Sequence, residues 1–241
     1  MNQITYDIVT MLLSLVALLI SITLHEVAHG WASLKLGDDT ARSFGRLSLN
    51  PFAHINPMAF GLLALLMILS TFRGGGATSG FAMSLLSVVV CFSFARPVPV
   101  TSRGLKNPVK DMALIALAGP VTNIIVALVA MILLKYTPYL IFSDSEFLVY
   151  VAFLLMYFFS YIVQLNVGLA VFNLVPIPPL DGSKILYAFL PRKLLITFVS
   201  YERYITMGLF VLLILGVLDR PLDIAGSYVI SGLDFLVNLL P

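Results

Sequence analysis

The chain has 241 residues, of which 60% are hydrophobic and only 11% are charged, and its formal net charge is +2. This balance is far from that of a soluble globular domain, and so small a net charge gives no indication of nucleic-acid binding. The composition therefore predicts an integral membrane protein.

The first apolar stretch, Tyr6–Leu34, is long enough to cross a bilayer, which takes about 17–25 helical residues. It lacks the basic start and small-residue cleavage site of a signal peptide, so we expect it to be retained as the first membrane helix. Near its end lies the pattern HExxH, formed by His25, Glu26 and His29. Residues four positions apart share one helix face, so the two imidazoles can hold one zinc ion with the carboxylate beside it.

A hydrolytic zinc site keeps one position open for a water molecule, which Glu26 could deprotonate as a general base. The alternative is that so short a pattern occurs by chance. Its place in an apolar span argues for function, because ionisable groups are costly there.

Polar residues follow the first span and are expected outside the membrane core. Within them, residues 43–49 alternate weakly between apolar and polar side chains. This pattern predicts a short strand or hairpin near the cytoplasmic face. Such a strand could pair with an extended substrate, but a plain surface hairpin is an equally good interpretation.

Further apolar stretches predict further membrane helices. Three are long, and residues 57–95 are divided by a glycine-rich turn into two shorter spans, which gives about six crossings in all. Residues 224–240 carry Asp234 and are expected to form an interfacial or half-buried helix. The long stretches are Met112–Lys135, Phe147–Phe172 and Tyr204–Leu218, and the shorter spans are Pro57–Phe72 and Phe81–Ala95.

Basic residues are distributed unevenly about these predicted spans. Of the 14 Lys and Arg residues, all but Arg73, Lys135 and Arg220 fall on one side. By the positive-inside rule that side is cytoplasmic. We therefore expect the N-terminus outside and the HExxH end of the first helix towards the cytoplasm.

A catalytic zinc ion usually has three protein ligands, so His25 and His29 need a partner. The remaining candidates are His54, Asp38, Asp39 and Asp181. Asp181 is favoured because it follows a proline-rich break in an apolar stretch, and non-helical backbone at membrane depth usually lines a polar cavity. Asp181 could instead cap the helix that follows it. His54 lies between turn residues, which favours a backbone hydrogen bond over metal binding.

Two motifs together resemble those of the site-2 proteases, a family of intramembrane zinc metalloproteases. They are HEVAHG at residues 25–30 with its preceding helix and NLVPIPPLDG at residues 173–182, supported in order by NPFAHINP, ARPVPV and AGPVTN. The resemblance covers about residues 15–190 and corresponds to the compact form, without PDZ or CBS domains.

The resemblance implies a role for individual residues of this chain. His25, His29 and Asp181 would be the ligands of one zinc ion per chain, and Glu26 would be the general base. Asn123 and Asn173 would bind the substrate or stabilise its carbonyl oxygen. Either amide could instead hydrogen-bond a neighbouring helix.

The predicted protein is thus an all-α polytopic membrane protease. We expect a single domain over residues 1–241, with a core at 1–190 and C-terminal helices at 199–241. Its partners would be the lipid bilayer and a membrane-spanning protein substrate, with no nucleic acid. Two other functions remain open: a divalent-metal transporter, which would also place His and Asp inside a membrane, and an inactive scaffold.

Overall fold

The computed structural model describes residues 3–54, 61, 98–101, 104–142 and 145–240 of the chain. The described part is helical and contains no strand. Its elements in chain order are α1 (Gln3–Leu36), α2 (Thr40–Ser43), η1 (Pro51–Ala53), α5 (Pro108–Tyr136), η3 (Thr137–Phe142), α6 (Glu146–Asn173), α7 (Asp181–Tyr187), α8 (Arg192–Ile214) and α9 (Asp219–Asn238).

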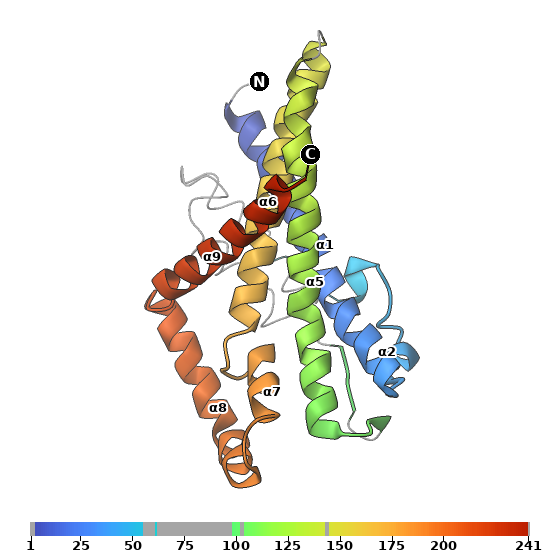
Figure 1. The fold of residues 1–241 in the computed structure, drawn as a ribbon, viewed down its shortest axis with the longest axis vertical. Coiled ribbons are helices and arrows are strands. Elements are labelled where there is room, and N and C mark those ends of the chain that lie inside the picture. The colour runs from blue at the N-terminus through green and yellow to red at the C-terminus, as the bar shows by residue number, and fades with distance from the viewer. Residues whose placement is uncertain (1–2, 55–60, 62–97, 102–103, 143–144, 241) are drawn as a thin grey trace.

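Three long helices, α1, α5 and α6, run side by side and form the centre of the structure (Figure 1). Each packs against the other two, and α9 lies across α5 and α6. Most side chains at the centre are small or aliphatic, which lets the helices approach closely. Buried core residues come from α1 (Ala17, Leu18, Ile22), α5 (Ala127, Ala130, Met131), α6 (Tyr161, Ile162, Val163, Leu165, Val167, Leu169) and α9 (Leu233, Val237).

Four described helical segments are long and apolar enough to cross a membrane. They match the four long stretches expected from the sequence, with one clear difference in bounds: the last segment begins at Arg192 rather than Tyr204 and ends at Ile214. The two shorter spans predicted within residues 57–95 lie, apart from residue 61, outside the described residues. The segments are Gln3–Leu36, Pro108–Ile141, Glu146–Asn173 and Arg192–Ile214.

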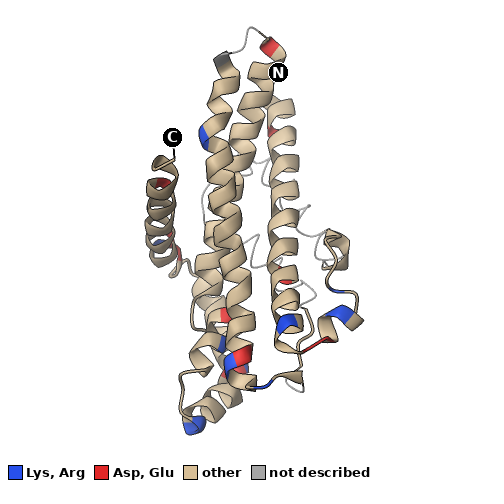
Figure 2. Ribbon diagram, turned by 45° about the vertical axis from the view of Figure 1, so that its right-hand side comes forward, with Lys and Arg blue, Asp and Glu red and all other residues tan. Residues whose placement is uncertain are grey.

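The outer faces of these helices are apolar as well. On α1, for example, Leu12, Val16 and Ile20 are exposed. Figure 2 shows long stretches of ribbon without a charged position, and basic positions gathered mainly towards the lower end. An apolar surface of this extent on a helix bundle fits contact with lipid. The chain is therefore an integral membrane protein.

The strand predicted at residues 43–49 does not form. Thr40–Ser43 is a short helix, and the chain then turns through Gly45, whose φ of 66° lies in the left-handed region that glycine adopts without strain. The turn is closed by hydrogen bonds from Gly45 N to the Arg42 carbonyl (3.0 Å) and from Arg46 N to the Ala41 carbonyl (2.8 Å). These local bonds replace the ladder that a strand would need.

The helix break predicted at the proline-rich stretch before Asp181 is confirmed. Helix α6 ends at Asn173 and α7 begins at Asp181, and the prolines between them prevent a continuous helix. The turn closes so tightly that a Cβ at Gly182 would overlap the carbonyl oxygens of Leu174 and Val175. This turn brings α7 back against α5.

Asp38, just after α1, joins two segments that are far apart in the sequence. Its buried carboxylate accepts hydrogen bonds from the backbone N and hydroxyl of Thr40 and from those of Thr101, the latter at 2.9 and 3.0 Å. Burial by itself raises the pKa of Asp38, but the hydrogen bonds from Thr40 and Thr101 outweigh it and bring the pKa below its ordinary value.

We expect Asp38→Asn to lower the free energy of unfolding by about 1–3 kcal/mol at pH 7, because bonds to a charged acceptor are lost. A folded-state pKa below the unfolded value of about 3.9 means that the carboxylate stabilises the fold above that pH. The stabilisation is lost as pH falls through the folded pKa. Thermal unfolding in detergent should therefore show a difference that shrinks below about pH 4.

Asp39→Asn is the matched control. Asp39 is exposed, and its side chain makes no capping hydrogen bond at the start of α2. Equal losses of stability in the two variants would show that the bonds of Asp38 are not the cause.

Candidate metal centre

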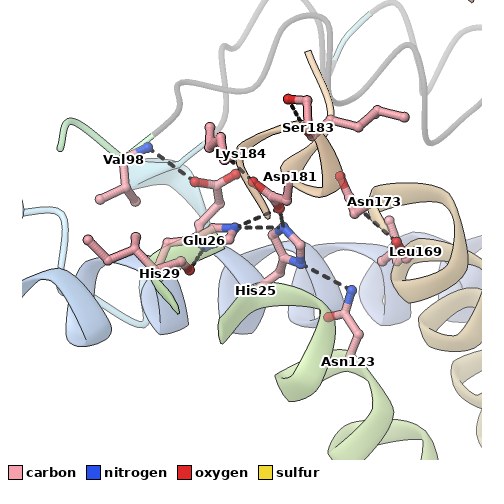
Figure 3. A network of polar contacts seen from close by, with 12 residues as sticks. His25, Glu26, His29, Val98, Asn123, Leu169, Asn173, Asp181, Ser183 and Lys184 are labelled. Atoms are coloured by element: carbon pink, nitrogen blue, oxygen red, sulfur yellow. Dashed lines mark hydrogen bonds and ion pairs between the residues drawn. The ribbon is translucent and has the colours of Figure 1, made fainter. Parts of the chain in front are cut away.

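The HExxH residues lie on α1, with the histidines one turn apart and their side chains buried. His25 is 1% exposed, Glu26 5% and His29 9%. The two imidazoles meet edge to face, and their Nε2 atoms are 3.0 Å apart. Figure 3 shows both rings directed towards α7. The sequence prediction that one helix face presents both nitrogens is confirmed.

Asp181 completes this cluster from α7. Its Oδ2 atom lies 3.3 Å from Nε2 of His25 and 3.0 Å from Nε2 of His29. The helix α7 is capped by Leu180, and Asp181 is the first residue inside it. The carboxylate therefore faces the imidazoles and does not occupy the capping position.

These three side chains fit a zinc ion. Ligand atoms about 2.0–2.1 Å from a tetrahedral zinc ion lie about 3.3 Å from one another. The observed separations of 3.0, 3.0 and 3.3 Å are close to that value, and the donor set of two imidazoles and one carboxylate is typical of catalytic zinc. Among the described residues no other such group of His, Cys, Asp and Glu occurs.

Two further contacts hold the outer sides of this group. The Nδ1 atom of His29 lies 2.7 Å from the carbonyl oxygen of Ile115, and Nζ of Lys184 donates to Oδ1 of Asp181 at 3.3 Å. Partners of this kind orient the ligand side chains. Neither contact was predicted from the sequence. A backbone carbonyl has no sequence signal, but Lys184 follows Asp181 by three residues, a spacing at which two helical side chains can meet.

Glu26 lies beside the group without joining it. Its Oε2 atom accepts a hydrogen bond of 3.1 Å from the backbone N of Val98, a contact that the ARPVPV motif did not indicate. A cavity of about 630 Å³ opens onto Glu26 and the three candidate ligands. Its other walls are mainly apolar and come from α5, α6, α8 and residues 98–100.

The two asparagines named from the sequence lie in different surroundings. Asn173 lines the cavity, and its Nδ2 group donates to the Leu169 carbonyl at 2.9 Å. Asn123 is fully buried, with Nδ2 3.2 Å from Nδ1 of His25 (Figure 3). A substrate role is compatible with the place of Asn173, whereas Asn123 contacts a candidate ligand instead.

The other candidate ligands lie elsewhere. His54 is fully buried, but its Nε2 atom is 2.7 Å from the carbonyl oxygen of Ser48, the kind of backbone contact expected of a loop histidine. Asp38 is held by Thr40 and Thr101, and Asp39 is exposed.

Comparisons with known proteins agree with this chemistry. The family model for peptidase family M50 matches residues 13–216. The chain belongs to peptidase family M50. This is the site-2 protease family, so the resemblance drawn from the sequence is confirmed.

Three curated relatives carry similar names. The chain is 36% identical to "Putative zinc metalloprotease YwhC" of Bacillus subtilis over 93% of its own length and 89% of the relative's. It is 28% identical to "Putative zinc metalloprotease Rip2" of Mycolicibacterium smegmatis, over 68% and 52% of the two chains. It is 42% identical to "Putative zinc metalloprotease MJ0611" of Methanocaldococcus jannaschii, over 30% and 31%. No solved structure gives a significant match.

Family membership and the geometry together identify the enzyme class. The chain is a zinc metalloendopeptidase, and His25, His29 and Asp181 form a group that can bind its zinc ion.

We expect Asp181→Ser to bind zinc far below one ion per chain and to form no product. Serine is nearly as good a helix cap as aspartate, so a capping role would leave both properties intact. As a neutral side chain it is a poor zinc ligand, and two imidazoles alone bind zinc weakly. Metal analysis and a cleavage assay on the same purified sample measure both properties.

His54→Ala is the control and should retain zinc, because its imidazole contacts Ser48 instead of the metal group. Zinc loss in His54→Ala combined with full zinc in Asp181→Ser would show that His54, and not Asp181, is the third zinc ligand.

Proposed function

We propose that the chain is an intramembrane endopeptidase that hydrolyses peptide bonds of membrane-embedded proteins. The main support is the depth of the metal group within a membrane-spanning helix. His25 precedes the end of α1 at Leu36 by eleven residues, which corresponds to about 16 Å along the helix axis. The site is therefore suited to a peptide bond inside or close to the bilayer.

Glu26 is the proposed general base. It opens onto the same cavity as His25, His29 and Asp181, and its hydrogen bond from Val98 holds one carboxylate oxygen in place. When bound, zinc polarises a peptide carbonyl and lowers the pKa of a water molecule to about 7. Glu26 would take the proton from that water and pass it to the leaving nitrogen.

The cavity indicates what the substrate offers. Its apolar lining includes Met112, Phe172, Leu209 and Leu213, which suits apolar side chains on either side of the cleaved bond. A helical substrate hides its peptide bonds in internal hydrogen bonds, so it must unwind locally before cleavage. We assign Asn173 to contact with the unwound backbone, because it lines the cavity beside Asp181.

The proposed orientation places the metal site towards the cytoplasm and the N-terminus outside. The start of α5 and the end of α1 meet at the end of the bundle where basic positions gather (Figures 1 and 2). The positive-inside rule makes this end cytoplasmic.

Glu26→Gln should abolish cleavage of a single-span substrate in detergent while about one zinc ion per chain remains bound. The base is not a ligand, and loss of a general base typically costs about 10²–10⁴-fold in rate. Wild-type activity in this variant would contradict the assigned role. A wild-type protein that moves divalent metal into proteoliposomes but cuts nothing would be a transporter instead.

Cysteine labelling tests the orientation after Cys91, the single cysteine of the sequence, is replaced by serine. Lys106→Cys and Arg192→Cys should react from the cytoplasmic side and Glu146→Cys only from the opposite side, because α5 and α6 each cross the membrane once between these positions. Reaction of positions 106 and 146 from the same side would refute this topology.

A further inference from the structure

The AGPVTN motif, residues 118–123, lies on α5 directly against both histidines of the metal group. We propose that this part of α5 fixes the ring orientation and tautomer of His25 and His29, and that Asn123 acts on His25 through its side-chain oxygen. Asn123 is then a positioning residue and not a substrate-binding one. The proposal rests on zinc binding by the two histidines.

Gly119 allows the close approach on which these contacts depend. A Cβ atom at this position would lie 2.5 Å from Cε1 of His25 and 2.5 Å from Nε2 of His29, well inside van der Waals contact. The α5 backbone at Gly119 therefore lies so close to both rings that no side chain fits between them. Any larger residue would push at least one imidazole away.

The carbonyl of Ile115 holds the first ring. Its oxygen lies 2.7 Å from Nδ1 of His29, so this nitrogen carries the proton and Nε2 keeps its lone pair for the metal. Pro120, inside the same helix, has no N–H to bond the carbonyl of Ala116, the residue after Ile115, so this turn of α5 lacks one helical hydrogen bond next to the contact. The backbone of α5 thus selects the tautomer of His29 that a metal needs.

Asn123 holds the second ring in the corresponding way. Its amide lies 3.2 Å from Nδ1 of His25, and its Oδ1 atom, fully buried, has no hydrogen-bond partner among the residues that the structure describes. When Nε2 of His25 binds metal, Nδ1 carries a proton and needs an acceptor. A half-turn of the amide, which exchanges two atoms that are hard to distinguish, presents Oδ1 to that proton.

The choice between the two amide orientations is made by the histidine. In either orientation one amide atom of Asn123 faces Nδ1 of His25, and the other has no hydrogen-bond partner among the described residues. The number of hydrogen bonds made by the amide therefore does not favour either orientation. With Nδ2 donating, His25 would carry its proton on Nε2 and could not bind zinc as a neutral ligand. Metal binding and the oxygen-facing amide therefore stabilise each other.

Two substitutions at position 123 separate positioning from substrate binding. Asn123→Leu removes the acceptor at similar size, and we expect zinc affinity to fall about 10–100-fold, as it does when such outer partners are lost. Asn123→Asp keeps an acceptor for Nδ1–H and should restore zinc affinity to the wild-type level or better. An amide that donates to a substrate carbonyl could not be replaced by aspartate.

Asn166→Leu is the matched control. Asn166 is also fully buried and donates to Ser21 of α1 at 2.8 Å. Within the described part of the chain its Oδ1 atom also has no partner, and its side chain makes no hydrogen bond to a candidate ligand. Its loss should cost stability without changing zinc affinity. If Asn123→Leu does not fold, Asn123→Ala replaces it in the test, because alanine also lacks the acceptor and has a smaller side chain.

Competition between each purified variant and a chelator for Zn²⁺ gives the affinity, and the visible absorption spectrum of Co²⁺ reports the ligand geometry. Zinc affinity in Asn123→Leu equal to wild type, or no recovery in Asn123→Asp, would overturn the positioning role. Lost cleavage with unchanged zinc affinity in Asn123→Leu would do so while leaving the proposed protease intact. Failure of the wild type to bind zinc would overturn both.

Discussion

Ionisable side chains buried among apolar helices each need a partner, because an unpaired charge or polar group at membrane depth costs several kcal/mol. Here the imidazoles of α1 face the carboxylate of Asp181 on α7, and their outer nitrogens lie against α5. Glu26 accepts a hydrogen bond from Val98. Every one of these contacts joins α1 to a distant part of the chain. The site therefore forms only where α1, α5, α7 and residue 98 come together, and its contacts add to the apolar packing of the helices.

The return of α7 towards α1 depends on the break after α6. A continuous helix would carry Asp181 about 12 Å beyond Asn173, at 1.5 Å per residue. The prolines of residues 176–179 end the helix, and Gly182 allows the backbone to fold back on the carbonyls of Leu174 and Val175. Backbone that leaves the helix here lines the polar side of the cavity, which is where such backbone is tolerated in a membrane.

Residues 98–101 connect the site to the segment that follows α1. The backbone N–H of Val98 donates to Glu26, and the backbone N–H of Thr101 donates to Asp38. Asp38 follows Glu26 by twelve residues in the sequence. One short segment thus touches both the proposed base and the loop that follows α1. Through this double attachment, the carboxylate of Asp38 holds the same segment that contacts Glu26.

The sequence alone determined the parts of this protein that depend on local rules. Apolar length set the long helices, helical periodicity placed His25 and His29 on one face, and proline chemistry ended α6 before Asp181. Tertiary structure decided the rest. The alternation of residues 43–49 predicted a strand, but this segment starts at the end of a short helix and forms a turn instead. The contacts of Val98, Ile115 and Asn123 arise only when α5 and residues 98–101 pack against α1. A backbone N–H or carbonyl is the same group in every residue, so its partner is set by the packing of distant segments and not by the letter at its position.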